Sequence, residues 1–214
     1  MRATALPQST GATAAAGRAD TAQLPAADEA LMLAYARGDL ASFEELYSRH
    51  ERPLYRFLLR SVRVPSVADE LLQEVFLSVI RSAPHYEARA RFTTWLYRIA
   101  RNRLVDHWRS SDAAAWQSVN DVDGHEVSLI DNLVADASGQ PEHIALDRGR
   151  ARDLARALED LPAAQRETFL LHVEAGLSIE QISTVTGCPH ESIKSRFRYA
   201  CAKLRARMSH WSQP

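Results

Sequence analysis

The stretch from Leu177 to Leu204 constrains the fold more than any other part of the chain, because it reads as a helix, a tight turn and a longer helix. Ser178 is a residue type that caps helix N-termini, and apolar residues follow it at helical spacing. Gly187 then provides a position that tolerates a positive φ, and Pro189 suits the first turn of a new helix. This order of signals predicts a helix-turn-helix.

The second helix of this pair has one apolar face and one polar face when its residues are placed at 100° intervals. Residues 190–207 contain six Lys or Arg and a single acidic residue. The short side chain of Ser195 lies at the centre of the polar face, and Lys194, Arg196 and Arg198 flank it. Such a helix fits the major groove of DNA, with its centre on base edges and its cations on phosphates. The alternative is an amphipathic helix whose outer face is simply solvated.

A second basic segment lies in the N-terminal half of the chain. Residues 89–109 hold six Arg and one acidic residue, whereas residues 112–147 hold eight acidic residues and no Lys or Arg. This basic, acidic, basic order indicates two separate surfaces for a polyanion.

The helix expected over residues 91–109 carries aromatic side chains on two faces. One apolar face is expected to point to the helical core, and it consists of Phe92, Trp95, Leu96 and Ile99. On the other side, an arc of about 100° is shared by Tyr97, Arg98, Arg101 and Trp108. Aromatic rings beside guanidinium groups can stack unpaired bases while holding phosphates. The alternative is that Trp95 and Tyr97 are both core residues and the arginines are solvated.

The remaining segments predict further helices and no β-strand, so the fold class is all-α. We expect two small helical domains, residues 28–110 and 142–214, of which the C-terminal one contains the helix-turn-helix. A flexible acidic linker over residues 111–141 should join them, and residues 1–27 should form a disordered tail because they have almost no large apolar side chains.

The helix boundaries follow from local signals. Asp28 is expected to cap the first helix, and Pro53 is expected to kink or split the second, over residues 40–62. Pro65 should form a turn before a helix over residues 67–82, and Pro162 should separate two later helices.

Several other functional classes find no support. Cys188 and Cys201 have no His or Cys cluster of metal spacing around them, so we expect small buried apolar residues and no disulfide or zinc site. No apolar run approaches a membrane span, and the N-terminal residues lack the apolar core of a secretory signal, which indicates a cytoplasmic protein. The eight histidines are scattered, and no paired carboxylates or glycine-rich phosphate loop are present, so we expect neither an enzyme nor a cofactor.

Three blocks of the sequence together resemble the bacterial RNA polymerase sigma factors of the extracytoplasmic-function (ECF) class. ADELLQEVF, Ala68–Phe76, is similar to the family's polymerase-binding helix. RFTTWLYRIARNRLVDHWR, Arg91–Arg109, resembles its promoter-melting segment, and Leu177–Arg205 resembles its helix-turn-helix for the upstream promoter element. The resemblance covers roughly residues 28–208.

The resemblance implies a factor that binds core RNA polymerase and directs promoter recognition and DNA melting, usually under the control of an anti-sigma partner. Residues 28–110 would be sigma region 2 and residues 142–214 sigma region 4. Core polymerase would be bound by Asp69, Glu70, Gln73 and Glu74. The unpaired −10 strand would be held by Tyr97, Arg98, Arg101, Asn102 and Trp108, with a flipped base under the loop Ala83–Arg91. The duplex −35 element would be contacted by Glu191, Ser192, Lys194, Ser195, Arg196, Arg198 and Tyr199.

The sequence departs from the pattern of the family in four ways: the pair Asp69–Glu70 reverses the commoner acidic order, and Ser183, Glu191 and Tyr199 each replace a more frequent residue. The main rival interpretation is a one-domain helix-turn-helix regulator whose N-terminal helices bind a ligand or dimerise. That interpretation offers no reason for the second basic, aromatic helix.

Overall fold

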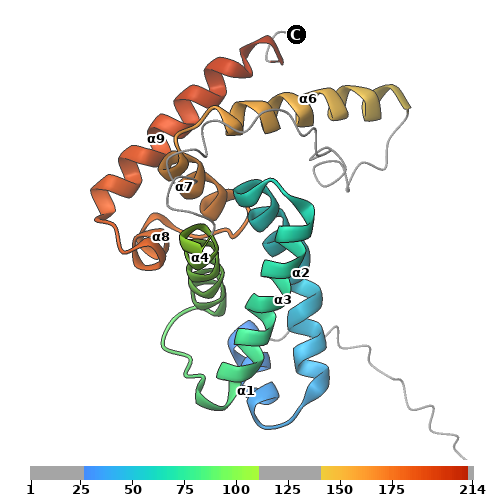
Figure 1. Cartoon of the computed structure of the whole chain (residues 1–214), viewed down its shortest axis with the longest axis vertical. Coiled ribbons are helices and arrows are strands. Elements are labelled where there is room, and N and C mark those ends of the chain that lie inside the picture. The colour runs from blue at the N-terminus through green and yellow to red at the C-terminus, as the bar shows by residue number, and fades with distance from the viewer. Residues whose placement is uncertain (1–26, 111–140, 212–214) are drawn as a thin grey trace, which may run out of the picture.

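Every secondary-structure element is helical in the part of the chain that the computed structural model describes, residues 27–110 and 141–211 (Figure 1). The all-α expectation is confirmed for these residues. Nearly all of the expected tail and nearly all of the expected linker lie outside the described residues.

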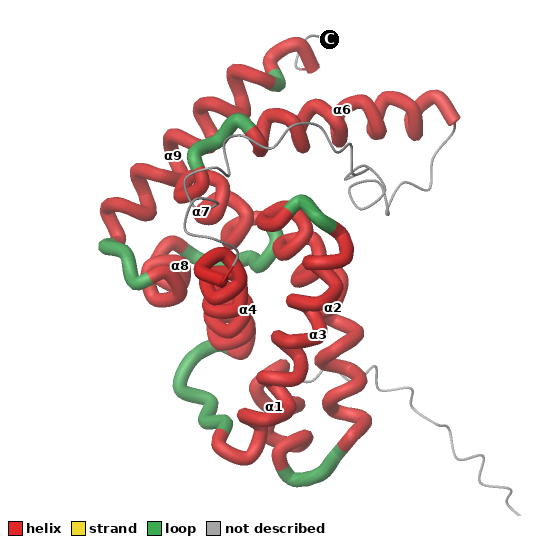
Figure 2. Tube along the Cα trace, in the orientation of Figure 1, coloured by secondary structure: helices red, strands yellow, loops and turns green. Residues whose placement is uncertain are grey.

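The N-terminal half contains α1 (Asp28–Ala36), α2 (Leu40–Val62), α3 (Pro65–Ser82), the short 3₁₀ helix η1 (Ala83–His85) and α4 (Phe92–Ser110). The C-terminal half contains α6 (Pro141–Glu159), α7 (Ala163–Val173), α8 (Ile179–Thr186), α9 (His190–Arg207) and the 3₁₀ helix η2 (Ser209–Trp211). Figure 2 shows the loops that separate these helices, including the long one between η1 and α4.

Two proline expectations differ from the structure. α2 continues through Pro53 as a single helix, so of the two expected outcomes, a kink or a split, the split does not occur. Leu54, Phe57 and Leu58 just beyond it are buried, and this packing outweighs the loss of one helical hydrogen bond. Pro65 is not in a turn but begins α3, because its missing N–H costs nothing in a first helical turn.

Acidic residues of α1 hold this helix to two neighbours. Asp28 does not act as the expected cap: Ala27 precedes α1, and the Asp28 carboxylate lies 2.8 Å from both Arg49 Nη1 and His50 Nε2 of α2. Glu29 Oε1 accepts a 2.6 Å hydrogen bond from the Phe92 N–H at the start of α4. This carboxylate satisfies a backbone donor that has no partner within its own helix. α1 therefore fixes where α4 begins.

The helix-turn-helix has the local structure that the sequence predicts. Ser178 forms a capping box with Gln181 at the start of α8, and Gly187 ends α8 in the left-handed region at φ = +69°. Ser183 donates a 2.6 Å hydrogen bond from its hydroxyl to the Cys188 carbonyl, which ties α8 to the turn. Pro189 is the residue before α9 and not its first residue.

The two halves pack against each other. α8 lies against α4, and α7 contacts α2 (Figure 1). Most of the buried apolar side chains of both halves belong to one connected cluster. Among the described helices, none is both long and apolar enough to cross a membrane.

Candidate nucleic-acid and polymerase interfaces

The outer face of α9 is accessible along its length. Its apolar side is anchored by the buried residues Ile193, Ala200 and Leu204. The residues predicted to meet DNA lie on the other side: Glu191, Lys194, Arg198 and Tyr199 are exposed, and Ser192, Ser195 and Arg196 are half-buried. The structure thus brings all seven together on one surface, while their contact with DNA stays a prediction.

Two arginines of α9 are held in defined positions. The Arg198 guanidinium lies 5.2 Å from the centre of the Tyr199 ring, which is 53% exposed, so the pair presents a cation and an aromatic ring together. Arg196 Nη1 lies 3.3 Å from Cys188 Sγ in the preceding turn. This contact orients Arg196 toward the start of α9.

Tyr97 is in the core, so its expected place on an accessible stacking surface is wrong. Its side chain is 1% exposed, and its ring meets Phe57 of α2 edge to face at 5.3 Å. Burial raises the pKa of the Tyr97 hydroxyl well above its usual range. The physical reason is that α4 is covered on more than one side: α2 and α3 pack against it, and so does the C-terminal half.

The other residues predicted to bind the −10 strand differ in their exposure to solvent. Arg98 and Asn102 are exposed. Arg101 is half-buried and its Nε donates to Glu167 Oε1 of α7 at 2.9 Å, and Trp108 is half-buried against the core cluster. The predicted set therefore does not form a single open face.

A different face of α4 is accessible. Trp95, Arg98, Asn102 and Arg109 follow one another at spacings of three, four and seven residues, which places them on one side of the helix. Trp95, expected in the core, is half-buried at the edge of this face, where its ring meets Tyr86 edge to face at 5.0 Å. The helical spacing of Arg98, Asn102 and Arg109 is visible in the sequence, but spacing alone does not show that this side of α4 is the uncovered one.

A cavity of about 580 Å³ opens beside this face, between α4 and the loop that precedes it. Its lining includes Arg81, His85, Tyr86, Trp95 and Arg98, with Thr184 of α8 at one side. Tyr86 is buried, and its pKa is raised to about 12 by burial and then by the carboxylates of Glu29 and Asp28. The lining combines two aromatic rings with the cations of Arg81, Arg89 and Arg98 and one carboxylate, that of Glu87, which pairs with Arg89.

The outer face of α3 carries the four residues predicted to bind polymerase, and Asp69, Glu70, Gln73 and Glu74 are all exposed. Leu77 continues the same face one turn further and is 47% exposed.

Comparisons with known proteins identify the family. The family models for sigma-70 region 2 and sigma-70 region 4 match residues 46–114 and 151–204. The ECF RNA polymerase sigma factor SigM of Mycobacterium tuberculosis is 31% identical over 182 residues, which cover 85% of this chain and 83% of SigM. The chain belongs to the ECF family of RNA polymerase sigma factors.

A second relative agrees with this assignment, and two solved structures share the fold. The RNA polymerase sigma factor CarQ of Myxococcus xanthus is 34% identical over 167 residues, covering 77% of this chain and 87% of CarQ. The structure of CnrH in complex with the cytosolic domain of CnrY shares the fold at a TM-score of 0.59 and 24% identity, over 86% of this chain and 99% of CnrH. The structure of the sigma factor RpoE of Bartonella quintana with the anti-sigma factor NepR shares the fold at a TM-score of 0.58 and 22% identity. The match covers 78% of this chain and 96% of the other.

The family defines what the protein does: this sigma factor binds core RNA polymerase and directs promoter recognition and DNA melting at the start of transcription. The rival interpretation as a one-domain regulator is not favoured, because the N-terminal half itself matches a sigma-factor region. The region 2 model matches most of α2, all of α3 and all of α4.

Proposed function

We propose that this sigma factor uses three separate helical surfaces, each for one partner. The outer face of α3 binds core polymerase, the accessible face of α4 with its cavity binds the unpaired −10 strand, and α9 binds the duplex −35 element. Residues 28–110 and 142–214 then act as region 2 and region 4, with residues 111–141 as the link between them.

The observation that carries the proposal is the cavity of about 580 Å³ beside Trp95 and Arg98. A base that leaves the duplex loses its stacking partners, and an aromatic wall replaces them while nearby cations hold the phosphates. Trp95 therefore takes the stacking role that the sequence assigned to Tyr97. Arg98 and Asn102 hold the strand on the same face.

On α9, the central residues contact base edges and the flanking cations contact phosphates. Lys194 and Arg198 lie on the exposed side of the helix, as phosphate contacts require. Glu191 near the helix start is suited to accept a hydrogen bond from the exocyclic amine of cytosine. Tyr199 is suited to an apolar contact with a thymine methyl group.

On α3, the carboxylates of Glu70 and Glu74 meet basic helices of core polymerase. The exposed Leu77 adds an apolar contact at the centre of the same interface. The protein works in the cytoplasm beside polymerase and catalyses no reaction of its own. An anti-sigma factor is a further partner, by analogy with the RpoE–NepR complex.

Charge reversal on α3 tests the polymerase-binding surface. The double variant E70K/E74K should lose most of its binding to core polymerase, because both side chains are exposed and would repel a basic partner. The matched control E44K/E159K changes the net charge equally at two exposed positions elsewhere and should bind normally. Equal binding by both variants would place the polymerase contact on another face.

Permanganate reactivity of thymines in the promoter tests the strand-binding surface. The variant R98A should be recruited with polymerase but should leave the −10 thymines less reactive than the wild type does. Full reactivity with R98A would contradict the role given to this face of α4.

A further inference from the structure

Two arginines from different helices meet at the end of α6 and share one backbone carbonyl. Arg63, the residue that follows α2, donates from Nη2 to the Glu159 carbonyl oxygen at 3.4 Å, and Arg166 of α7 donates from Nη1 to the same oxygen at 3.5 Å. Both distances lie beyond the usual range for an N–H···O hydrogen bond, so neither contact is strong. Each guanidinium group has five N–H donors, and this carbonyl takes only one donor from each.

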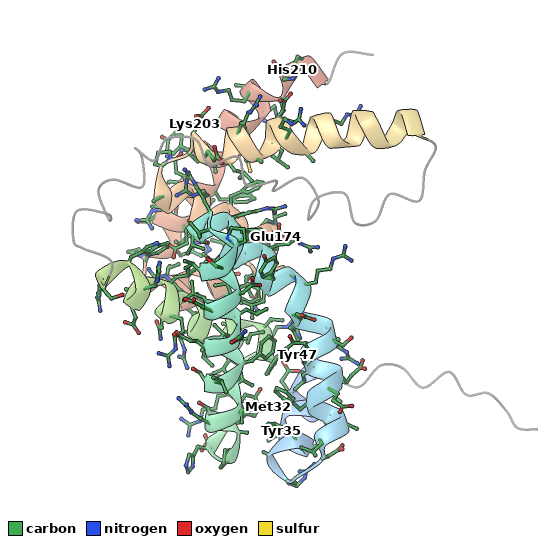
Figure 3. The ribbon with its side chains drawn as sticks, turned by 45° about the vertical axis from the view of Figure 1, so that its right-hand side comes forward. Met32, Tyr35, Tyr47, Glu174, Lys203 and His210 are labelled. Atoms are coloured by element: carbon green, nitrogen blue, oxygen red, sulfur yellow. The ribbon has the colours of Figure 1, made fainter. Side chains whose placement is uncertain are left out.

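Arg166 is a buried cation without a carboxylate partner. Among the described residues two arginines are buried, Arg60 at 9% exposed and Arg166 at 5%. Arg60 pairs directly with the carboxylate of Glu174, which Figure 3 labels, whereas Arg166 forms no ion pair within the part of the chain that the structure describes. Burial, and then the charge of Arg63, lower the pKa of Arg166 to about 10 against the opposing effect of Glu159, so Arg166 is still a cation at neutral pH. A buried charge normally has a partner of opposite charge, and Arg166 therefore lacks one.

Arg63 adds a second positive charge to the same place and gives it access to solvent. Its Nε is enclosed by protein and has no hydrogen-bond partner among the residues described. The Arg63 side chain as a whole is half-buried, and its contact with Glu159 lies at the surface. A small solute can therefore reach the two guanidinium groups from the surrounding water.

The end of α6 compensates only part of this positive charge. Glu159 is the last residue of α6, and the free carbonyls at a helix C-terminus are equivalent to about half a negative charge. Two guanidinium groups beside them leave about one and a half positive charges. The Glu159 carboxylate is exposed, so water and salt screen it, and the neighbouring carboxylate of Asp160 pairs with Arg207. Capping of α6 therefore explains one arginine at this position but not two.

We propose that Arg63 and Arg166 form a binding site for a phosphate group with two negative charges, either free inorganic phosphate or the terminal phosphate of a nucleotide. Guanidinium groups donate paired N–H bonds to phosphate oxygens, and a phosphate monoester carries close to two negative charges near neutral pH. A dianion compensates both arginines, whereas a carboxylate or a nucleic-acid phosphodiester brings one negative charge. The site is separate from the surfaces of α3, α4 and α9 described above, so this inference does not rest on how they bind polymerase or promoter DNA.

Isothermal titration calorimetry of the full chain with inorganic phosphate, at pH 8 and fixed ionic strength, tests the site. The variants R63Q and R166Q each remove one cation, and glutamine keeps a donor for the Glu159 carbonyl. The matched control R152Q/R205Q removes two exposed arginines from the C-terminal half. Circular dichroism checks the helix content of every variant. If R166Q does not fold, R63Q still tests the site, because its side chain is only half-buried.

The wild type should bind one phosphate per chain. R63Q and R166Q should each bind phosphate at least about tenfold more weakly, because a hydrogen bond to a charged group usually contributes that much to affinity. The control should bind like the wild type. At constant ionic strength, phosphate should raise the melting temperatures of the wild type and the control more than those of R63Q and R166Q, since a ligand stabilises the folded form that binds it.

Two further ligands distinguish the sources of the phosphate group. Tighter binding of adenosine 5′-diphosphate than of inorganic phosphate would identify a nucleotide as the ligand, and the reverse order would identify free phosphate; both results support the site. Dimethyl phosphate, which carries one negative charge as the nucleic-acid backbone does, should bind more weakly than either, and equal binding would contradict the preference for a dianion. The site itself is overturned if the wild type binds no phosphate, if R63Q and R166Q bind it as the wild type does, or if the control loses as much affinity as they do.

Discussion

Replacement of Trp95 by alanine should weaken binding of the unpaired −10 strand while leaving the helices folded. The ring lines the cavity beside α4 and is half-buried. Stacking of one base on an aromatic side chain contributes about 1–3 kcal/mol, which corresponds to roughly 5- to 150-fold in the dissociation constant. The ring contacts with Tyr86 at 5.0 Å and with Phe92 at 5.7 Å contribute about 0.5–1.5 kcal/mol each to folding stability beyond the apolar burial of this half-buried ring, so circular dichroism and the melting temperature of W95A are measured beside its strand binding.

The assay is fluorescence anisotropy with a labelled single-stranded −10 oligonucleotide, measured in the complex with core polymerase. The matched control is Y97F, because the Tyr97 hydroxyl is buried without a hydrogen-bond partner among the described residues. Removal of that hydroxyl should leave strand binding unchanged and folding stability equal or higher. If W95A binds within twofold of the wild type, or if Y97F loses as much affinity as W95A, the strand does not stack on Trp95.

Three further predictions concern positions outside the cavity wall. E29A should lower the melting temperature and weaken −10 binding, because the Phe92 N–H loses its 2.6 Å acceptor; E29Q, which keeps an acceptor, should restore most of both, and no rescue would contradict this role. R198A should weaken binding to the −35 duplex. A plot of the logarithm of the association constant against the logarithm of the salt concentration should become less steep by about 1, and an unchanged slope would exclude a phosphate contact. The hydrogen bond from the Ser42 hydroxyl lowers the pKa of Asp39 in the folded protein below its ordinary value of 3.8. The ionised Asp39 carboxylate therefore stabilises the fold above pH 3.8, and this stabilisation is lost as the pH falls through the lowered pKa of the folded state. The melting temperatures of D39A and the wild type should therefore differ at pH 7 and converge in acid, and a gap that persists in acid would argue against this linkage.

The helix-turn-helix could be predicted because its signals are local. Ser178 and Gln181 cap α8 through contacts within one turn, and Gly187 satisfies a backbone conformation that few other residues adopt. These contacts depend on the identity of neighbouring residues and not on what packs against them. The sequence therefore contains nearly all the information that this motif needs.

The accessible face of α4 could not be predicted in the same way. Helical spacing separates one side of a helix from another, but it does not say how many sides are covered. Tyr97 and Arg101 face α2 and α7, and α7 is more than 50 residues further along the chain. Their burial is a tertiary effect, and the assignment of Tyr97 to the outer surface failed for this reason.

The carboxylates of α1 illustrate the same limit. Asp28 is of a residue type that often caps helices, yet its carboxylate is bound by Arg49 and His50 of a neighbouring helix. The cavity beside α4 also depends on long-range contacts, since α3, η1, the loop after it, α4 and α8 all contribute to its lining. A resemblance to the family indicated a pocket under the loop, but only the structure indicates which side chains form its walls.

Mapping of transcript start sites tests the central claim most directly. The purified full chain, combined with core RNA polymerase and genomic DNA, should yield transcripts that start at a limited set of sites sharing one −10 and one −35 sequence. W95A should reduce transcription from these sites, and R198A should reduce it most where the −35 match is weakest. Start sites identical to those of core polymerase alone would contradict the conclusion that the two basic helical surfaces select promoters.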